Sequence, residues 1–167
     1  MSYLLHPPLL DETGLSEALR WYIQGLTERN GLEIALEVPK DFERLSREME
    51  LVMFRLVQES LTNIHRHSGS KQATIRLARN PDGVTLEVQD KGKGITAEKL
   101  SEIQSHGSGV GIRGMRERAR HFGGHMLIES NHKGTKISFK FPSSITPAKR
   151  EAITRKDIIV EPTHMAG

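Results

Sequence analysis

The sequence predicts an α+β fold, a two-layer sandwich in which one mixed β-sheet carries its helices on a single face. Three observations favour this fold. Residues 72–90 and 125–141 each alternate apolar and polar side chains on both sides of a turn, as β-hairpins do. Three longer segments carry apolar residues at the three- and four-residue spacing of amphipathic helices. A short alternating segment, 32–38, separates the first two of these helices and supplies a fifth strand.

The limits of these elements follow from their capping and turn residues. Asn30-Gly31 and Gly123-Gly124 are strong helix stops, and Asn80-Pro81-Asp82-Gly83 has the composition of a hairpin turn. In chain order we expect a helix at 14–31, a strand at 32–38, a helix at 44–67, strands at 72–80 and 84–90, a short helix at 96–104, a helix at 112–122, and strands at 125–130 and 135–141.

The two ends of the chain differ from this periodic centre. The paired prolines Pro7-Pro8 interrupt any helix that enters from upstream, so residues 1–13 are predicted to be a linker that leads in from another part of a longer protein. Residues 14–142 form the predicted domain. Residues 143–167 contain Pro147 and Pro162 within a mixed-charge stretch of weak periodicity, which indicates a flexible or loosely docked tail.

Composition excludes several classes of function. The 167 residues are 36% hydrophobic and 27% charged, as in soluble globular proteins, and no apolar run approaches the ~20 residues of a membrane span. The chain has no cysteine, so it has neither disulfides nor thiolate metal sites. A net charge of +3 is spread along the chain and aromatic residues make up only 5%, so nucleic-acid binding is not expected.

The helix predicted at 44–67 carries an unusual row of polar groups. Glu59, Asn63, Arg66 and His67 recur at three- and four-residue spacing, which places them along one face of an α-helix. An asparagine oxygen suits magnesium, which keeps several waters and shares its remaining ligands with phosphates. A charged, solvent-exposed helix face explains the same row if it is considered alone.

Two glycine-containing segments follow. Asp90-Lys91-Gly92-Lys93-Gly94 comes directly after a strand, where a carboxylate can accept a hydrogen bond from a ligand amine, although the same residues are common in simple turns. Residues 107–114, with sequence GSGVGIRG, open a helix, where converging N–H groups bind phosphate. This segment contains G-x-G-x-x-G but lacks the preceding buried strand of a dinucleotide-binding fold.

Taken together and in order, these motifs resemble the ATP-binding domain of sensor histidine kinases. E-x-x-x-N-x-x-R-H, D-x-G-x-G, G-x-G-x-G and a final Gly-Thr, at Gly134-Thr135, occur in the expected order. The segments QESLTNIHRHSGS and GVGIRGMRERARHFGG are similar to the branch of nitrate-sensor and membrane-fluidity-sensor kinases. The resemblance covers about residues 4–142 and implies the Bergerat fold of the GHKL ATPase superfamily.

The resemblance implies a role for each matching position. Asn63 would ligate Mg²⁺, and Glu59 beside it would act as the catalytic polar residue that handles a water or a proton. Asp90 would accept from the adenine amino group, supported by Thr135. The remaining implied ATP contacts are Arg66 near the phosphates, His67 near the nucleotide, Gly92, Gly94 and Ile95 after the strand, and Gly109, Val110, Gly111 and Ile112 around the phosphates.

The resemblance also implies partners and a location. The cofactors would be ATP and Mg²⁺, and the γ-phosphate would go to a phosphoacceptor histidine on a dimerisation domain, then to a response regulator. The domain would be cytoplasmic, without membrane contact of its own, in a parent that can be anchored in the inner membrane. His6 precedes two prolines and cannot lie in an acceptor helix, so we do not expect this chain to phosphorylate itself.

Two alternatives to this function remain at this stage. One is a stand-alone serine kinase of the same fold, of the anti-sigma-factor sort; the lead-in segment LHPPLLDETGLSEAL counts against it. The other is a degenerate module that binds partners without nucleotide; the intact Glu59, Asn63, Asp90 and glycine loops count against that.

Overall fold

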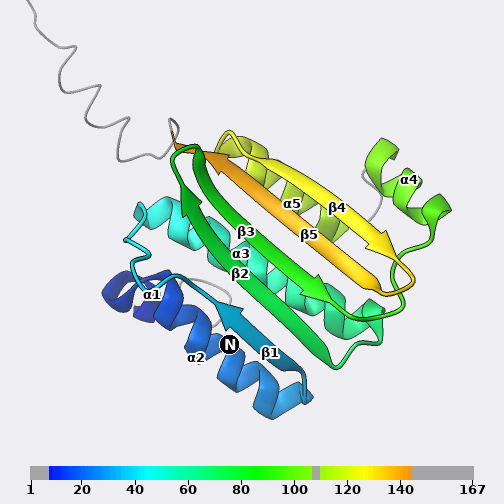
Figure 1. Ribbon diagram of the computed structural model, residues 1–167, viewed down its shortest axis with the longest axis horizontal. Coiled ribbons are helices and arrows are strands. Elements are labelled where there is room, and N and C mark those ends of the chain that lie inside the picture. The colour runs from blue at the N-terminus through cyan, green and yellow to red at the C-terminus, as the bar shows by residue number, and fades with distance from the viewer. Residues whose placement is uncertain (1–7, 107–109, 144–167) are drawn as a thin grey trace, which may run out of the picture.

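The computed structural model describes residues 8–106 and 110–143. It contains a five-stranded sheet with strand order β1-β2-β3-β5-β4 (Figure 1). The elements are α1 (Pro8–Thr13), α2 (Leu15–Asn30), β1 (Glu33–Glu37), α3 (Arg47–Asn63), the π-helical turn η2 (Ile64–Ser68), β2 (Gln72–Asn80), β3 (Gly83–Asp90), α4 (Ala97–His106), α5 (Val110–His121), β4 (His125–Asn131) and β5 (Gly134–Pro142). The predicted tail beyond Ser143 and residues 1–7 of the predicted linker lie outside the described residues.

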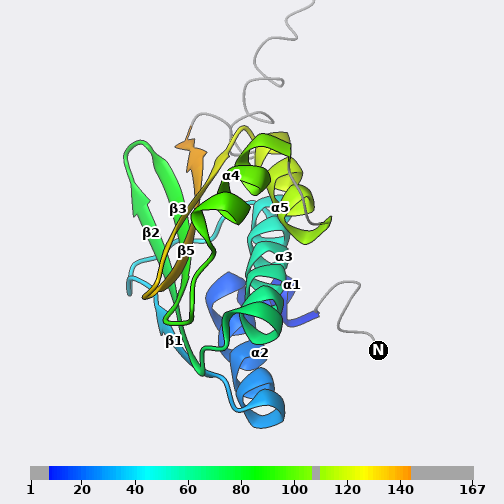
Figure 2. The same ribbon diagram turned by 90° about the vertical axis from the view of Figure 1, so that its right-hand side faces the viewer.

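The sheet is mixed, as the sequence predicts. β1 pairs with β2 in parallel, and the pairs β2–β3, β3–β5 and β4–β5 are antiparallel. A parallel pair cannot be joined by a tight turn, so the chain crosses from β1 to β2 through α3. That crossover lays α3 against the sheet. In Figure 2 the helices α1, α2, α3 and α5 occupy one side of the sheet, whereas α4 lies beyond the β4 edge in Figure 1.

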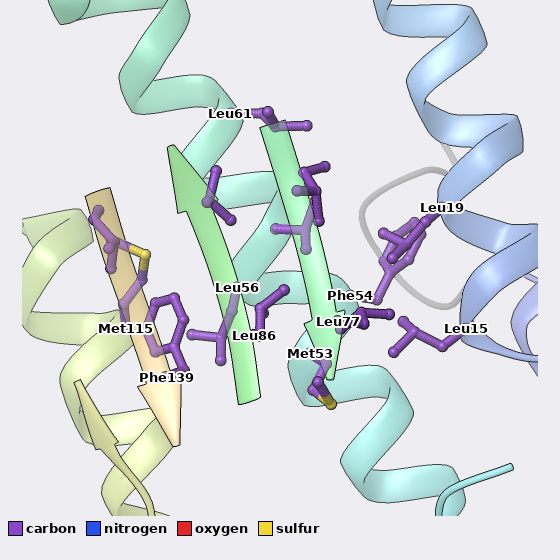
Figure 3. Close-up of a cluster of buried hydrophobic side chains, with 14 of the residues drawn as sticks. Leu15, Leu19, Met53, Phe54, Leu56, Leu61, Leu77, Leu86, Met115 and Phe139 are labelled. Atoms are coloured by element: carbon purple, nitrogen blue, oxygen red, sulfur yellow. The ribbon is translucent and has the colours of Figure 1, made fainter. Parts of the chain in front are cut away.

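The core lies between these two layers. Alternate residues of each strand face the helices, and the apolar face of α3 meets them from the other side (Figure 3). Each large side chain that is fully buried here stabilises the fold by about 1.5–3 kcal/mol relative to exposure. The largest of those with almost no exposed surface are Phe54, Phe139, Phe141, Leu10, Leu15, Leu19, Met49, Met53, Leu56, Leu61, Ile75 and Leu77.

The start of α3 is fixed by a cap and by a buried carboxylate that pairs with an exposed arginine. The Ser46 side chain accepts a hydrogen bond from the Met49 amide at 3.2 Å, so the helix begins at Arg47, three residues later than predicted. Behind this cap, the Glu50 carboxylate is only 2% exposed. It accepts from Arg44 Nε at 2.9 Å, from Arg44 Nη2 at 3.2 Å and from the Leu45 amide at 3.2 Å. The hydrogen bond to Glu50 raises the pKa of Arg44 above its usual value.

Part of the segment that the sequence assigned to a linker is helical. α1 begins at Pro8, which suits the first position of a helix because proline lacks the N–H that would be unpaired there. Leu10 is buried in the core, and Asp11 lies 3.1 Å from the guanidinium of Arg47 on α3. Residues 8–13 therefore pack on the domain. Proline disrupts the interior of a helix, but at Pro8 it stands at the start of one.

Across residues 8–106 and 110–143, none of the helices combines the length and the apolar character that a membrane crossing requires.

The packing of α2 on α3 generates a pH prediction. The ring of Tyr22 meets that of Phe54 edge-to-face, with centroids 5.5 Å apart, and burial raises the pKa of Tyr22 above its usual value of 10.0. A pKa that is raised by folding stabilises the protein below the unfolded-state pKa and loses that contribution as pH rises through the folded-state pKa.

We therefore expect wild-type stability to fall more steeply above about pH 10 than that of Tyr22→Phe, whose ring cannot ionise. Urea unfolding of both proteins between pH 8 and pH 11 measures the difference. Parallel stability curves over this range would contradict the assignment.

Candidate functional site

The last turn of α3 presents two polar side chains that have no partner within the described part of the chain. Glu59 and Asn63 lie one turn apart and are both half-buried. The Nδ2 atom of Asn63 is fully buried and has no hydrogen-bond partner among the residues described. A buried amide N–H left unpaired in this way costs about 1–3 kcal/mol, so a water or a ligand is expected to accept a hydrogen bond from it.

The polar row predicted from Glu59 to His67 is interrupted. After Asn63 the helix continues as the π-helical turn η2, in which hydrogen bonds close over five residues rather than four. The three- and four-residue spacing of an α-helix therefore holds only as far as Asn63. Arg66 and His67 lie within η2 and are exposed, and Gly69 ends the turn at a φ of 67°. The expectation of one continuous α-helix over 44–67 was wrong at this end.

The second motif lies beside η2. Asp90, at the end of β3, is 4% exposed, and its Oδ1 accepts from the Gly92 amide at 2.7 Å. Its other carboxylate oxygen has no donor among the described residues. The Lys93 amide donates to the Ser68 carbonyl at 3.0 Å, and a Cβ at Gly92 would overlap that same carbonyl. Glycine at position 92 therefore allows the loop to close against η2, which brings the first two motifs together.

A row of polar residues continues across the sheet from Asp90. In β3, β4 and β5 the inward-facing positions are apolar along most of each strand and become polar at this one end. The polar residues are Asp90, Ser130 and Thr135, and Ser130 pairs directly with Thr135 in the β4–β5 ladder. A Cβ at Gly134 would overlap the Asp90 carbonyl, so the start of β5 also lies against the end of β3.

Ser130 connects this row to the loop after Asp90. Its Oγ accepts from the Ile95 amide at 2.7 Å, lies 2.7 Å from Thr135 Oγ1, and lies 3.3 Å from the Gly134 carbonyl oxygen. Gly94 just before Ile95 has a φ of 76°, and a Cβ there would overlap the carbonyl of Asn131. Sequence reasoning missed Ser130. The signal that could have found it is a serine at an inward position, two residues after the buried Ile128.

The third motif reaches the first through α5. α5 packs along α3, and the Ser60 hydroxyl lies 3.5 Å from the Met115 sulfur in the buried contact between them. At the start of α5, a Cβ on Gly111 would overlap the Glu59 carboxylate. Glycine therefore lets the first turn of this helix lie directly beside Glu59. Ile112 is half-buried against the core. Gly109 lies outside the described residues, and of Val110 only the backbone is described.

Arginine side chains of α3 and α5 lie close together one turn before Glu59. Burial, together with the charge of Arg118 on α5, lowers the pKa of Arg55 from its usual value. Beside Glu59, the N-terminus of α5 and the partnerless Asn63 amide favour an anionic ligand.

The described residues bring together most of the predicted site. Close approaches join Glu59 to Gly111 and Ser68 to Gly92, and Asn63 lies one turn after Glu59 on α3, while Thr135 is linked to Ile95 through Ser130. Within the described part of the chain, Arg66 and His67 form no hydrogen bond or ion pair with these groups. Among residues 8–106 and 110–143, no three His, Asp or Glu side chains converge as a metal site. The arrangement has the donors and acceptors of an anion and amine site rather than those of a protein-only metal centre.

Comparison with known proteins identifies the class of molecule to which this site belongs. Residues 48–145 match the family described as histidine kinase-, DNA gyrase B-, and HSP90-like ATPase. The match covers more than half of the chain, and the chain belongs to this family. It is an ATP-binding catalytic domain of the type found in two-component sensor histidine kinases, and the sequence-based expectation of that class is confirmed.

The individual relatives are bacterial sensor kinases. The chain is 31% identical over 153 residues to the sensor histidine kinase MctS of Rhizobium johnstonii, which is 91% of this chain and 33% of that protein. It is 35% identical over 143 residues to the histidine-protein kinase/phosphatase DegS of Bacillus subtilis, covering 83% and 37% respectively. The chain thus spans about a third of the length of these relatives.

A solved structure shows the same fold. The histidine kinase domain of the blue-light activated kinase from Erythrobacter litoralis EL346 superposes with a TM-score of 0.67 over 80% of this chain and 67% of that one, at 20% identity. The predicted α+β fold with a mixed sheet and helices on one face is confirmed.

The glycines of the site generate a stability prediction. Gly94 has a positive φ and faces the backbone carbonyl of Asn131, which cannot move aside cheaply, whereas Gly114 on α5 has open space around its Cα. Gly94→Ala should lower the free energy of unfolding by about 2 kcal/mol or more, combining left-handed strain with the overlap.

The matched variant Gly114→Ala should raise the free energy of unfolding by up to about 1 kcal/mol, since alanine favours the helix. Urea denaturation of the two variants and the wild type measures both changes. Equal effects of the two substitutions would show that Gly94 is not conformationally required.

Proposed function

We propose that this domain binds Mg-ATP between the end of α3, the β3–α4 loop and the start of α5, and presents the γ-phosphate to a histidine on another domain. The observation that carries the proposal is the buried, partnerless amide of Asn63 beside Glu59, next to the N-terminus of a helix whose Gly111 leaves room for a close approach. Phosphoryl transfer depends mainly on positioning and on neutralising charge, and these groups supply both.

The residues fit each part of the nucleotide. The free carboxylate oxygen of Asp90 suits the adenine amino group, and Thr135 is held close to it by the β-sheet. Backbone amides at the start of α5 suit phosphate oxygens. Asn63 would contribute one oxygen to Mg²⁺, which supplies charge neutralisation of the phosphates when bound, and Glu59 would hold a water or accept a proton.

The partners follow from the family. The acceptor would be a histidine on the dimerisation domain of a longer parent protein, and a response regulator would receive the phosphoryl group. The domain would act in the cytoplasm, and its parent can be anchored in the inner membrane. Support comes from relatives of which this chain spans about a third, and whose names describe histidine kinases.

Asn63→Ala tests the metal assignment. In the wild type, magnesium should strengthen ATP binding, because the metal is shared between Asn63 and the phosphates. In Asn63→Ala this enhancement should fall by about ten-fold or more, as when groups that hold a metal are removed. Calorimetric titration with ATP, with and without magnesium chloride, measures it.

The matched control is Asn30→Ala, which removes an exposed amide at the end of α2, away from the site. It should leave the magnesium enhancement at its wild-type value, and circular dichroism should show both variants folded. Equal ATP affinity of the wild type with and without magnesium would rule out the metal role of Asn63.

Asp90→Asn tests recognition of the base. Adenine offers an amino donor where guanine offers a carbonyl acceptor, so a carboxylate accepts from the first and repels the second. Replacing the carboxylate by an amide should weaken ATP binding by about 1.5–3 kcal/mol, roughly ten- to a hundred-fold in affinity.

Asp82→Asn, in the exposed β2–β3 turn at the opposite end of the strand, is the matched control and should bind ATP as the wild type does. Competition titration with ATP and GTP compares the three proteins. If the wild type binds GTP as tightly as ATP, Asp90 does not select the base.

A further inference from the structure

The geometry points to Ser130 as a positioning residue that fixes both the loop after Asp90 and the hydroxyl of Thr135, and thereby the base end of the nucleotide site. This inference rests on the proposed function, because it assigns the residue that shapes the adenine side of the same site. Ser130 itself lies on β4 behind this side of the site, and neither the sequence motifs nor the family comparison singles it out.

The first step is the connection to the loop. Ile95 is the residue at which the chain leaves the glycine segment and turns toward α4, and its amide donates to Ser130 Oγ at 2.7 Å. The preceding Gly94 needs a positive φ and packs against the carbonyl of Asn131, the neighbour of Ser130 on β4. One side-chain contact and one backbone contact from the same end of β4 therefore hold residues 94 and 95.

The same loop is also held on its other side, by residues 68–70. Lys93 donates from its amide to the Ser68 carbonyl at 3.0 Å, and the Lys91 amide donates to Ser70 Oγ at 3.3 Å. The loop is thus bound on one side by residues 68–70 and on the other by Ser130. The anchor at Ser68 uses the main-chain carbonyl and survives any side-chain substitution there, whereas the anchor to the Ile95 amide depends on the Ser130 hydroxyl.

The third step concerns the direction of a proton. A serine hydroxyl has one hydrogen to donate, and Ser130 already accepts from the Ile95 amide. The 2.7 Å contact with Thr135 Oγ1 can run in either direction: Ser130 donates to Thr135, or it accepts from Thr135 and donates to the Gly134 carbonyl at 3.3 Å. In both arrangements Ser130 takes up one hydrogen-bonding position of the Thr135 hydroxyl. Ser130 therefore restricts the hydrogen bonds that Thr135 can offer beside Asp90.

The inference predicts a loss of binding affinity only for ligands that carry the base. Ser130→Ala should weaken Mg-ATP binding about three- to ten-fold, the range expected when one or two neutral hydrogen bonds are lost. Binding of magnesium tripolyphosphate, which has no base, should not change. Ser130→Thr keeps the hydroxyl and suits a strand, so it should restore ATP binding. A general loss of structure would weaken both ligands alike and would not be restored in this pattern.

The matched control is Ser138→Ala, which removes a buried serine hydroxyl from the adjoining strand β5, away from the loop. It can cost stability, but it should leave affinity for Mg-ATP and for magnesium tripolyphosphate at wild-type values. Calorimetric titration of the four proteins with both ligands gives the comparison.

A second measurement needs no nucleotide. In Ser130→Ala the Ile95 amide loses its acceptor, so its hydrogen exchange, followed by NMR, should become several-fold faster. The Lys93 amide, held by Ser68, should exchange as in the wild type and serves as an internal reference. Failure of the wild type to bind ATP would contradict the proposed function, and the Ile95 amide would still decide whether Ser130 holds the loop. Unchanged exchange at Ile95, or unchanged ATP affinity in a protein that binds ATP, would overturn the inference.

Discussion

Helix α3 must bury one face against the sheet along its length, and this requirement decides where its last turn ends. The crossover from β1 to β2 passes through α3, so its apolar residues from Met49 to Leu61 fill the centre of the core. Beyond them the helix ends beside the C-terminal end of β3. Because the apolar face is already packed, Glu59 and Asn63 are left half-buried at this end of the sheet, with no partner from the described residues.

The other parts of the site depend on that placement. The loop after β3 closes against η2 because position 92 is glycine, and α5 starts beside Glu59 because position 111 is glycine. β4 and β5 change from apolar to polar on their inward faces at the same end, which puts Ser130 and Thr135 next to Asp90. Three segments distant in sequence thus contribute polar groups to one end of the sandwich, while the opposite end holds the β2–β3 turn.

The sequence predicted this architecture well where the signal was periodic. Alternation predicted both hairpins, and the spacing in 44–67 predicted the central helix with its buried face. The boundaries of this central helix were less predictable, because Ser46 could be recognised as a cap only once its side chain was seen to accept from the Met49 amide. The π-turn had no sequence signal, since His65 to Ser68 continue a helical pattern, so the break between Asn63 and the exposed Arg66 and His67 was not predicted.

The candidate site likewise contains residues that the sequence could predict and residues that it could not. The positions of Asp90 at a strand end, Gly92 in the following loop and Gly111 at a helix start could be predicted, because glycine and aspartate in this order have a physical reason to occur there. Ser130 could not, because a lone serine at the end of a strand is common and its role depends on a contact with Ile95, which lies 35 residues away in the chain. The ion pair between exposed Arg44 and buried Glu50 was also not predicted, because nothing in the sequence shows that the Glu50 carboxylate is buried.

The most direct test of the central claim follows the backbone amides of the isotope-labelled chain by NMR during titration with Mg-ATP. The account predicts that amides at the end of α3, in the Lys91–Ile95 loop and at the first turn of α5 shift together with a single dissociation constant, while those on the outer face of α2 do not move. Shifts confined to one of the three segments, or centred on α2, would contradict a single nucleotide site at this end of the sheet.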